Sequence, residues 1–137
     1  MAEKKGIHTL HRYYIWANRM RVHFDEVLQQ RMAAKIEKGR MEVESMLYMS
    51  YWYAGLYVVI EGWKALKLSD QVIDRLLHSG NVALLKRYRN GTFHFQKTYY
   101  DARFIELIEK GQNVVEWIRT LNSELGRWFL AQPSGTK

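Results

Sequence analysis

The residues best suited to chemistry are Arg89 and His94, which stand five positions apart after a basic, helix-forming stretch. Arginine is a permanent cation whose planar fork of donors fits a phosphate group. Histidine is the side chain whose ordinary pKa lies nearest to working pH, so it can accept or give a proton. The pair therefore suits chemistry on a phosphodiester.

The spacing of this pair constrains the local structure. Five residues of a regular α-helix turn through about 500°, which leaves the two side chains roughly 140° apart. Arg89 and His94 could not share one site if a helix ran straight through both. Asn is a favoured helix N-cap and Gly interrupts helices, so we expect a break at Asn90-Gly91. The break would let Arg89 turn toward the face that carries His94.

The pattern Arg89-Asn90-x-x-x-His94 resembles the R-x(4–6)-H signature of the HEPN superfamily, in which a polar residue, often Asn, follows the Arg. A long aromatic-rich stretch before the motif (about 42–66) and a long helical stretch after it (112–132) extend the resemblance. It implies an all-α, HEPN-like bundle of four to five helices that forms a dimer.

Many HEPN proteins are metal-independent ribonucleases, frequently toxins of toxin–antitoxin or phage-defence systems. The resemblance implies that His94 is the general base or acid, that Arg89 holds the phosphate, and that Asn90 orients His94 or bonds the phosphate. Attack by the ribose 2′-OH would leave a 2′,3′-cyclic phosphate without a metal or other cofactor. Two protomers would bring two copies of the motif to one cleft. We expect the protein to act in the cytoplasm.

Two other functions are compatible with the sequence. The first is a non-catalytic HEPN-like module that binds a nucleotide or docks a partner, with an antitoxin or a nucleotidyltransferase as the candidate. The second is a structural helical dimer, in which His94 is a buried histidine satisfied by a backbone carbonyl.

Further candidate RNA-binding residues flank the motif on both sides. They are basic or aromatic: Lys86, Arg87, Lys97, Tyr99 and Tyr100. Cations hold a nucleic-acid backbone and aromatic rings stack on its bases. The aromatic residues after His94 are equally compatible with a plain hydrophobic core.

Composition narrows the class of protein. At 137 residues the chain predicts a single domain, with flexible ends at about 1–6 and 133–137. It has no Cys, which excludes a disulfide scaffold, thiolate metal sites and a Cys nucleophile. Its net charge of +7 favours a polyanionic partner, although a basic surface also serves solubility. The most apolar run, Met46 to Ile60, is short for a membrane span, and we expect neither a membrane segment nor a secretory leader.

Apolar periodicity and capping residues predict the helices. They span His8 to about Glu37 (ending at Lys38-Gly39-Arg40), Glu42–Lys67, Asp70–His78 (capped by Ser69), Val82–Arg89 (capped by Asn81), a stretch from the cap Asp101 to Glu109, and Gln112–Gln132. The predicted core includes Phe104, Ile105, Ile108 and Val115. Arg12, Arg19, Arg21 and Arg31 form either a solvated face or a binding stripe on the first helix.

Metal chemistry has little support in the sequence. His8-x-x-His11 has a helical spacing for two ligands but no third ligand at a matching offset. There is no Glu-x-x-His motif of the di-iron bundles and no P-loop or glycine-rich dinucleotide fingerprint. We therefore expect no metal site and no cofactor.

Overall fold

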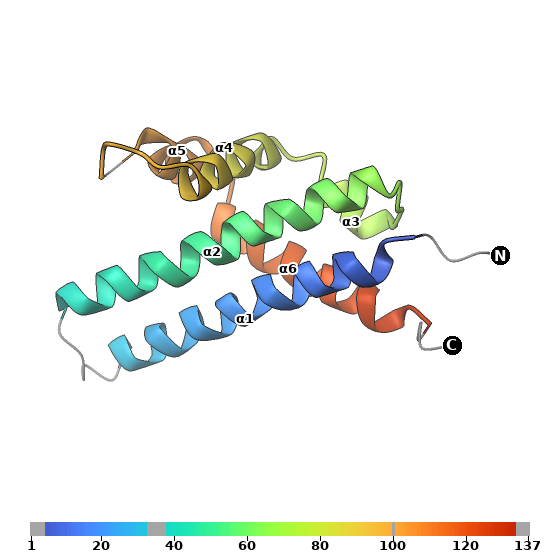
Figure 1. Ribbon diagram of the computed structural model, residues 1–137, viewed down its shortest axis with the longest axis horizontal. Helices are drawn as coiled ribbons and strands as arrows, with labels where there is room; N and C mark the ends of the chain where they lie inside the picture. Colours follow the sequence, from blue (N-terminus) through green and yellow to red (C-terminus); the bar gives the residue numbers. More distant parts are fainter. Residues whose placement is uncertain (1–4, 33–37, 100, 134–137) are drawn as a thin grey trace.

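The computed structural model describes residues 5–32, 38–99 and 101–133, and the regular secondary structure of this part of the chain is all helical (Figure 1). The predicted all-α class is confirmed, with six helices in the described residues rather than four or five. They are α1 (Ile7–Met32), α2 (Lys38–Ala65), α3 (Gln71–Leu76), α4 (Asn81–Phe93), α5 (Ala102–Lys110) and α6 (Val114–Ala131). Most of the predicted flexible ends, 1–4 and 134–137, lie outside the described residues.

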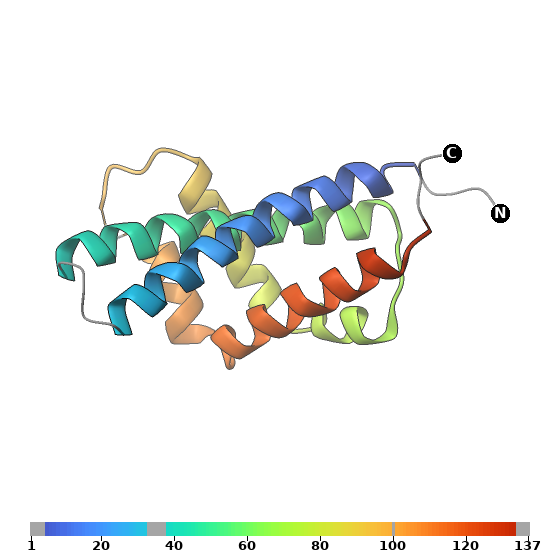
Figure 2. The ribbon, with the colours of Figure 1, turned by 90° about the horizontal axis from the view of Figure 1, so that it is seen from below.

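The central element is α2, which has α1 along one side and α4 along another (Figure 1). Seen from below, α6 runs beside α1 (Figure 2). The buried residues of α2 are mainly large and apolar: Trp52, Tyr53, Leu56, Val59, Ile60 and Trp63. The predicted buried helix is thus confirmed from Trp52 onward, whereas Leu47 and Tyr51 are nearly half exposed. None of the described helices is both long enough and apolar enough to cross a membrane.

Two glycines of α2 let α1 approach closely. A Cβ atom at Gly55 would lie 3.1 Å from the Cβ of Ala17, and one at Gly62 would collide with the side chain of Leu10. The absence of a side chain at Gly55 and at Gly62 therefore determines how closely α1 and α2 pack.

The predicted boundary between α1 and α2 and the predicted N-cap of α3 are wrong. Lys38-Gly39-Arg40 forms the first turn of α2 and does not end α1, which is described as Ile7–Met32, while residues 33–37 lie outside the described residues. The N-cap of α3 is Asp70 rather than Ser69, because the Asp70 carboxylate accepts from the backbone N–H groups of Val72 and Ile73, both at 3.1 Å.

The loop between α5 and α6 is held by the first residue of α4. Asn81 is buried, and its side chain donates to the carbonyl of Gln112 and accepts from the N–H of Gln112, each at 2.9 Å. The prediction that Asn81 caps α4 is wrong, since the N-cap is Gly80. The predicted cap of α5 is confirmed, with Asp101 accepting from the N–H of Arg103 at 2.9 Å.

Part of the predicted core in α5 and α6 is wrong. Ile105, Ile108 and Val115 are about half exposed, while Leu107 and Trp117 are buried instead. Helix α5 packs against α4 through the side that carries Leu107, so its isoleucines face away. Periodicity finds an apolar stripe but does not say which stripe meets a neighbouring helix.

Candidate functional site

Helix α4 carries the motif, and the predicted break at Asn90-Gly91 is wrong because the helix continues to Phe93. Gly91 is buried against α5, where an added Cβ would lie 3.2 Å from the Phe104 ring. The glycine therefore allows close packing of α4 on α5 and does not interrupt the helix.

His94 is the C-cap of α4 and has an extended backbone, with φ −113° and ψ 131°. Its N–H donates to the carbonyl of Asn90 at 3.1 Å, and Gln96 Nε2 donates to its carbonyl at 2.7 Å. The His94 side chain is exposed, so it is not a buried structural histidine. The helix runs without a break from Arg89 to Phe93, and the His94 N–H still closes a helical bond to Asn90, so the expected break that would turn Arg89 toward His94 is absent.

The Arg89 side chain is held in place by contacts with α2 and with its neighbour Asn90. Its side chain is only 18% exposed and donates from Nη1 to Glu61 Oε1 on α2 at 2.9 Å. Its guanidinium carbon lies 5.0 Å from the centroid of the Tyr57 ring, which is a cation–π distance. Its Nε donates to Asn90 Oδ1 at 2.9 Å.

These contacts leave donors available on Arg89. A guanidinium has five N–H donors, and the contacts with Asn90 and Glu61 use two of them. The observed contact of the Asn90 side chain is thus with Arg89 rather than with His94. Within the described residues, no hydrogen bond or ion pair joins Arg89 to His94.

The ring beneath Arg89 stays neutral at working pH. Burial raises the pKa of Tyr57, and the nearby Glu61 carboxylate raises it further, against the opposing effect of Arg89. Tyr57 therefore offers a neutral π-face to the guanidinium and does not compete as an anion.

The predicted RNA-binding cations of α4 face different ways. Lys86 is exposed and lies one helical turn before Arg89, so both belong to one side of α4. Arg87 instead turns to α5, where its Nε donates to both carboxylate oxygens of Glu106, at 2.7 and 2.9 Å. The Glu106 carboxylate thus holds this side chain toward α5.

The segment after His94 is exposed wherever the structure describes its aromatic residues. Phe95 is 92% exposed, Tyr99 is exposed as well, and Lys97 lies between them on the surface. The alternative that these rings belong to the core is wrong for Phe95 and Tyr99. Tyr100 lies outside the described residues.

Glu61 and Tyr57 are the residues of the site that the sequence did not reveal. Both come from α2, about thirty positions before the motif, so no local pattern links them to Arg89. The one available signal was the placement of a carboxylate directly after the apolar run that ends at Ile60.

One histidine of the pair His8 and His11 on α1 packs against α6. His11 stacks on Phe129 of α6, with ring centroids 4.8 Å apart and planes at 3°. Across the described residues, no group of three or more His, Cys, Asp or Glu side chains is arranged to hold a metal ion.

Comparisons of the chain with protein-family models, with curated proteins and with solved structures find no match. The HEPN resemblance accordingly depends on Arg89, Asn90 and His94 and on the helical context of these residues.

Proposed function

We propose that the protein is a metal-independent endoribonuclease of the HEPN type, acting in the cytoplasm as a toxin or defence component. The observation that carries this proposal is an exposed histidine directly after the helix whose Arg89 is held by Asn90 and Glu61. His94 is open to a substrate, and Arg89 is oriented by Asn90 and Glu61. Fixed orientation of such groups is what catalysis requires.

In the proposed reaction, His94 takes the proton of a ribose 2′-OH. The 2′-oxygen forms a bond to the adjacent phosphorus, and the bond from phosphorus to the 5′-oxygen breaks. The leaving 5′-oxygen takes a proton from the protonated His94 of a second protomer. The products are a 2′,3′-cyclic phosphate and a 5′-OH.

Arg89 would neutralise the charge that develops on the phosphate oxygens in the transition state. Its remaining N–H donors suit this role, because arginine can bind two phosphate oxygens at once. The Glu61 carboxylate opposes phosphate binding by its charge while it holds the guanidinium in place.

The reaction requires two histidines, and each chain supplies one in the motif. A patch of exposed apolar side chains adjoins the motif and would suit the dimer contact. It consists of Val43 and Leu47 together with Tyr51 and Phe93, whose ring centroids lie 5.9 Å apart. Pairing through this patch would bring two copies of α4 together around a two-fold axis.

A second candidate function is a non-catalytic module that binds a nucleotide or docks an antitoxin or nucleotidyltransferase. The observation that favours it is that two arginines of α4 form ion pairs with carboxylates, Arg89 with Glu61 and Arg87 with Glu106. Such a module would retain nucleotide affinity and show no cleavage.

The test is cleavage of a generic structured RNA in the presence of EDTA. The proposal predicts fragments with 2′,3′-cyclic phosphate ends, and no cleavage of the matching DNA, which lacks the 2′-OH. Fragments with 3′-OH ends, or no cleavage by a folded dimer, would contradict it. Retained nucleotide binding in the latter case would favour the second candidate.

A further inference from the structure

Helix α1 carries a second cluster of exposed aromatic and cationic side chains, apart from the motif. Trp16 is 56% exposed and Tyr13 is 37% exposed, with ring centroids 5.6 Å apart and planes at 78°. The guanidinium carbon of Arg12 lies 5.0 Å from the Trp16 centroid and 5.3 Å from that of Tyr13. We call Arg12, Tyr13 and Trp16 the α1 platform.

Along α1 itself, the charged side chains around the platform are all basic, whereas Glu61 of α2 lines the groove beside Tyr13. From Ile7 to Phe24, α1 has three arginines and three histidines but no carboxylate. Arg12 and Arg19 are both exposed, one on each side of Trp16 along the helix. An exposed indole flanked by cations suits a base that stacks on a ring while its phosphates meet the arginines.

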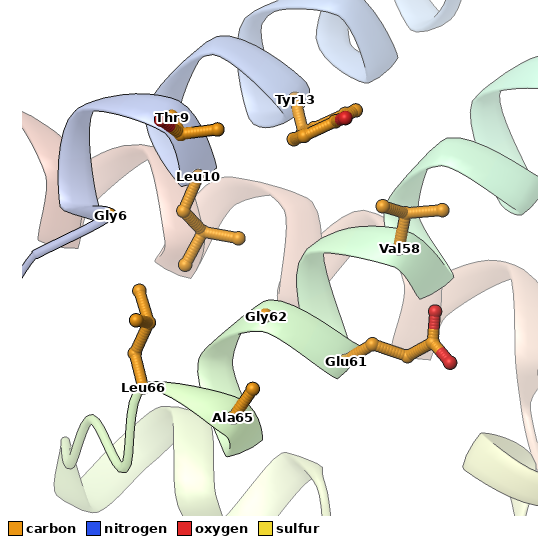
Figure 3. Close-up of a pocket in the computed structure, with 9 residues that line it drawn as sticks. All are labelled: Gly6, Thr9, Leu10, Tyr13, Val58, Glu61, Gly62, Ala65 and Leu66. Atoms are coloured by element: carbon orange, nitrogen blue, oxygen red, sulfur yellow. The ribbon is translucent and has the colours of Figure 1, made fainter.

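The platform borders a groove that contains Glu61, the partner of Arg89. Tyr13 lines a groove of about 440 Å³ between α1 and α2, which Val58 and Glu61 of α2 also line (Figure 3). Glu61 in turn forms the ion pair with Arg89. Glu61 thus belongs both to the groove that Tyr13 lines and to the surroundings of Arg89.

We propose that the α1 platform binds unpaired nucleotides, stacking bases on Trp16 and Tyr13 and holding phosphates with Arg12. The assignment of RNA as the physiological ligand rests on the function proposed above. A second copy of the chain fits this face less well, because a two-fold contact centred on it would bring the arginines of both copies together.

The test measures binding of single strands of about ten nucleotides, a length in the usual range for such sites. It uses the full chain with His94→Ala, so that cleavage does not interfere. Oligoadenylate RNA, its DNA counterpart and duplex RNA are the probes. Single strands of both kinds should bind comparably, and the duplex more weakly, because stacking on a protein ring needs an unpaired base.

Adding Trp16→Ala should weaken single-strand binding about 5- to 150-fold, the effect of losing one stacked base. Arg12→Gln should lower the salt dependence of binding by about 0.7 in the log–log slope, as expected for one lost phosphate contact on a single strand. The matched control is Val115→Ala, an exposed apolar residue of α6, which should leave the affinity unchanged.

Unchanged affinity in Trp16→Ala, equal binding of duplex RNA, or no binding at all would overturn the proposal. So would a change from dimer to monomer in Trp16→Ala, since the platform would then be a subunit contact. Binding that depends on Trp16, in a protein whose wild type cleaves no RNA, would uphold the platform and defeat only the proposed reaction.

Discussion

The polar groups around Asn122 and those of the motif lie on two sides of α2 and differ in their exposure to solvent. On the side that meets α1 and α6, Asn122 is only 3% exposed. Its Oδ1 accepts from Trp52 Nε1 at 3.0 Å, its Nδ2 donates to Asn18 Oδ1 at 2.9 Å, and its carbonyl accepts from the Tyr14 hydroxyl at 3.0 Å. Three helices are thereby joined through one buried amide.

On the side that meets α4, the polar groups of the motif reach the surface. His94 is exposed, and Arg89 has donors beyond those used by Asn90 and Glu61. A buried amide with satisfied partners stabilises the fold, whereas an exposed histidine contributes little to it. The difference separates the residues expected to control stability from those expected to control activity.

Arg89→Lys should sharpen this comparison through a large loss of cleavage. Lysine keeps the charge but loses the planar fork, so we expect cleavage to fall about 10²–10³-fold, as on removal of a transition-state donor. The measurement is a single-turnover cleavage rate at saturating protein. The matched control is Arg87→Lys on the same helix, which should change the rate little because Arg87 is committed to Glu106. Equal losses in both variants would contradict the assignment.

Asn122→Ala should lower the stability of the fold rather than the cleavage rate. It leaves the buried Trp52 N–H without its acceptor, so we expect the free energy of unfolding to fall by about 1–3 kcal/mol. Urea denaturation measures this change. Ser123→Ala, at the exposed neighbouring position, should have a negligible effect. A loss of cleavage by fully folded Asn122→Ala protein would contradict the assignment of Asn122 to stability alone.

The sequence predicted the elements better than their contacts. Capping chemistry is local, so Asp101 could be identified as the start of α5. Gly91 was misread because its role depends on Phe104 of another helix, which no local rule contains. The candidate pair Arg89 and His94 came from the sequence, but the Glu61 carboxylate that holds Arg89 required the packing of α2 against α4.

Acid should weaken the α1–α6 contact. Burial alone would raise the pKa of Asp25, but hydrogen bonds and charges from Arg119 and Arg21 outweigh it and lower the pKa. The pKa of Asp25 in the folded protein thus lies below its unfolded value of about 3.9. The stabilisation by its ion pairs is therefore fully present above that unfolded value and is lost as the pH falls through the folded-state pKa. Asp25→Asn should cost about 0.5–1 kcal/mol at pH 7 and reduce the acid sensitivity of urea unfolding. An unchanged pH profile would contradict this.

The smallest effect should come from Glu61→Gln. Removing one half-exposed carboxylate beside Arg89 eliminates its repulsion of phosphate, which at about 0.2–1 kcal/mol gives up to about a fivefold gain in RNA affinity. The gain should shrink as salt is added. Filter binding at two salt concentrations measures both. Weaker binding in this variant would show that the Glu61 charge is needed to position Arg89.

The most direct test of the account is His94→Ala, measured for cleavage and for unfolding in the same preparation. The account predicts a cleavage rate about 10²–10⁴-fold below wild type, the usual contribution of a general acid or base, with the free energy of unfolding changed by less than about 0.5 kcal/mol. His78→Ala, which removes another exposed histidine, should leave both quantities unchanged. Cleavage at the wild-type rate by His94→Ala would contradict the account.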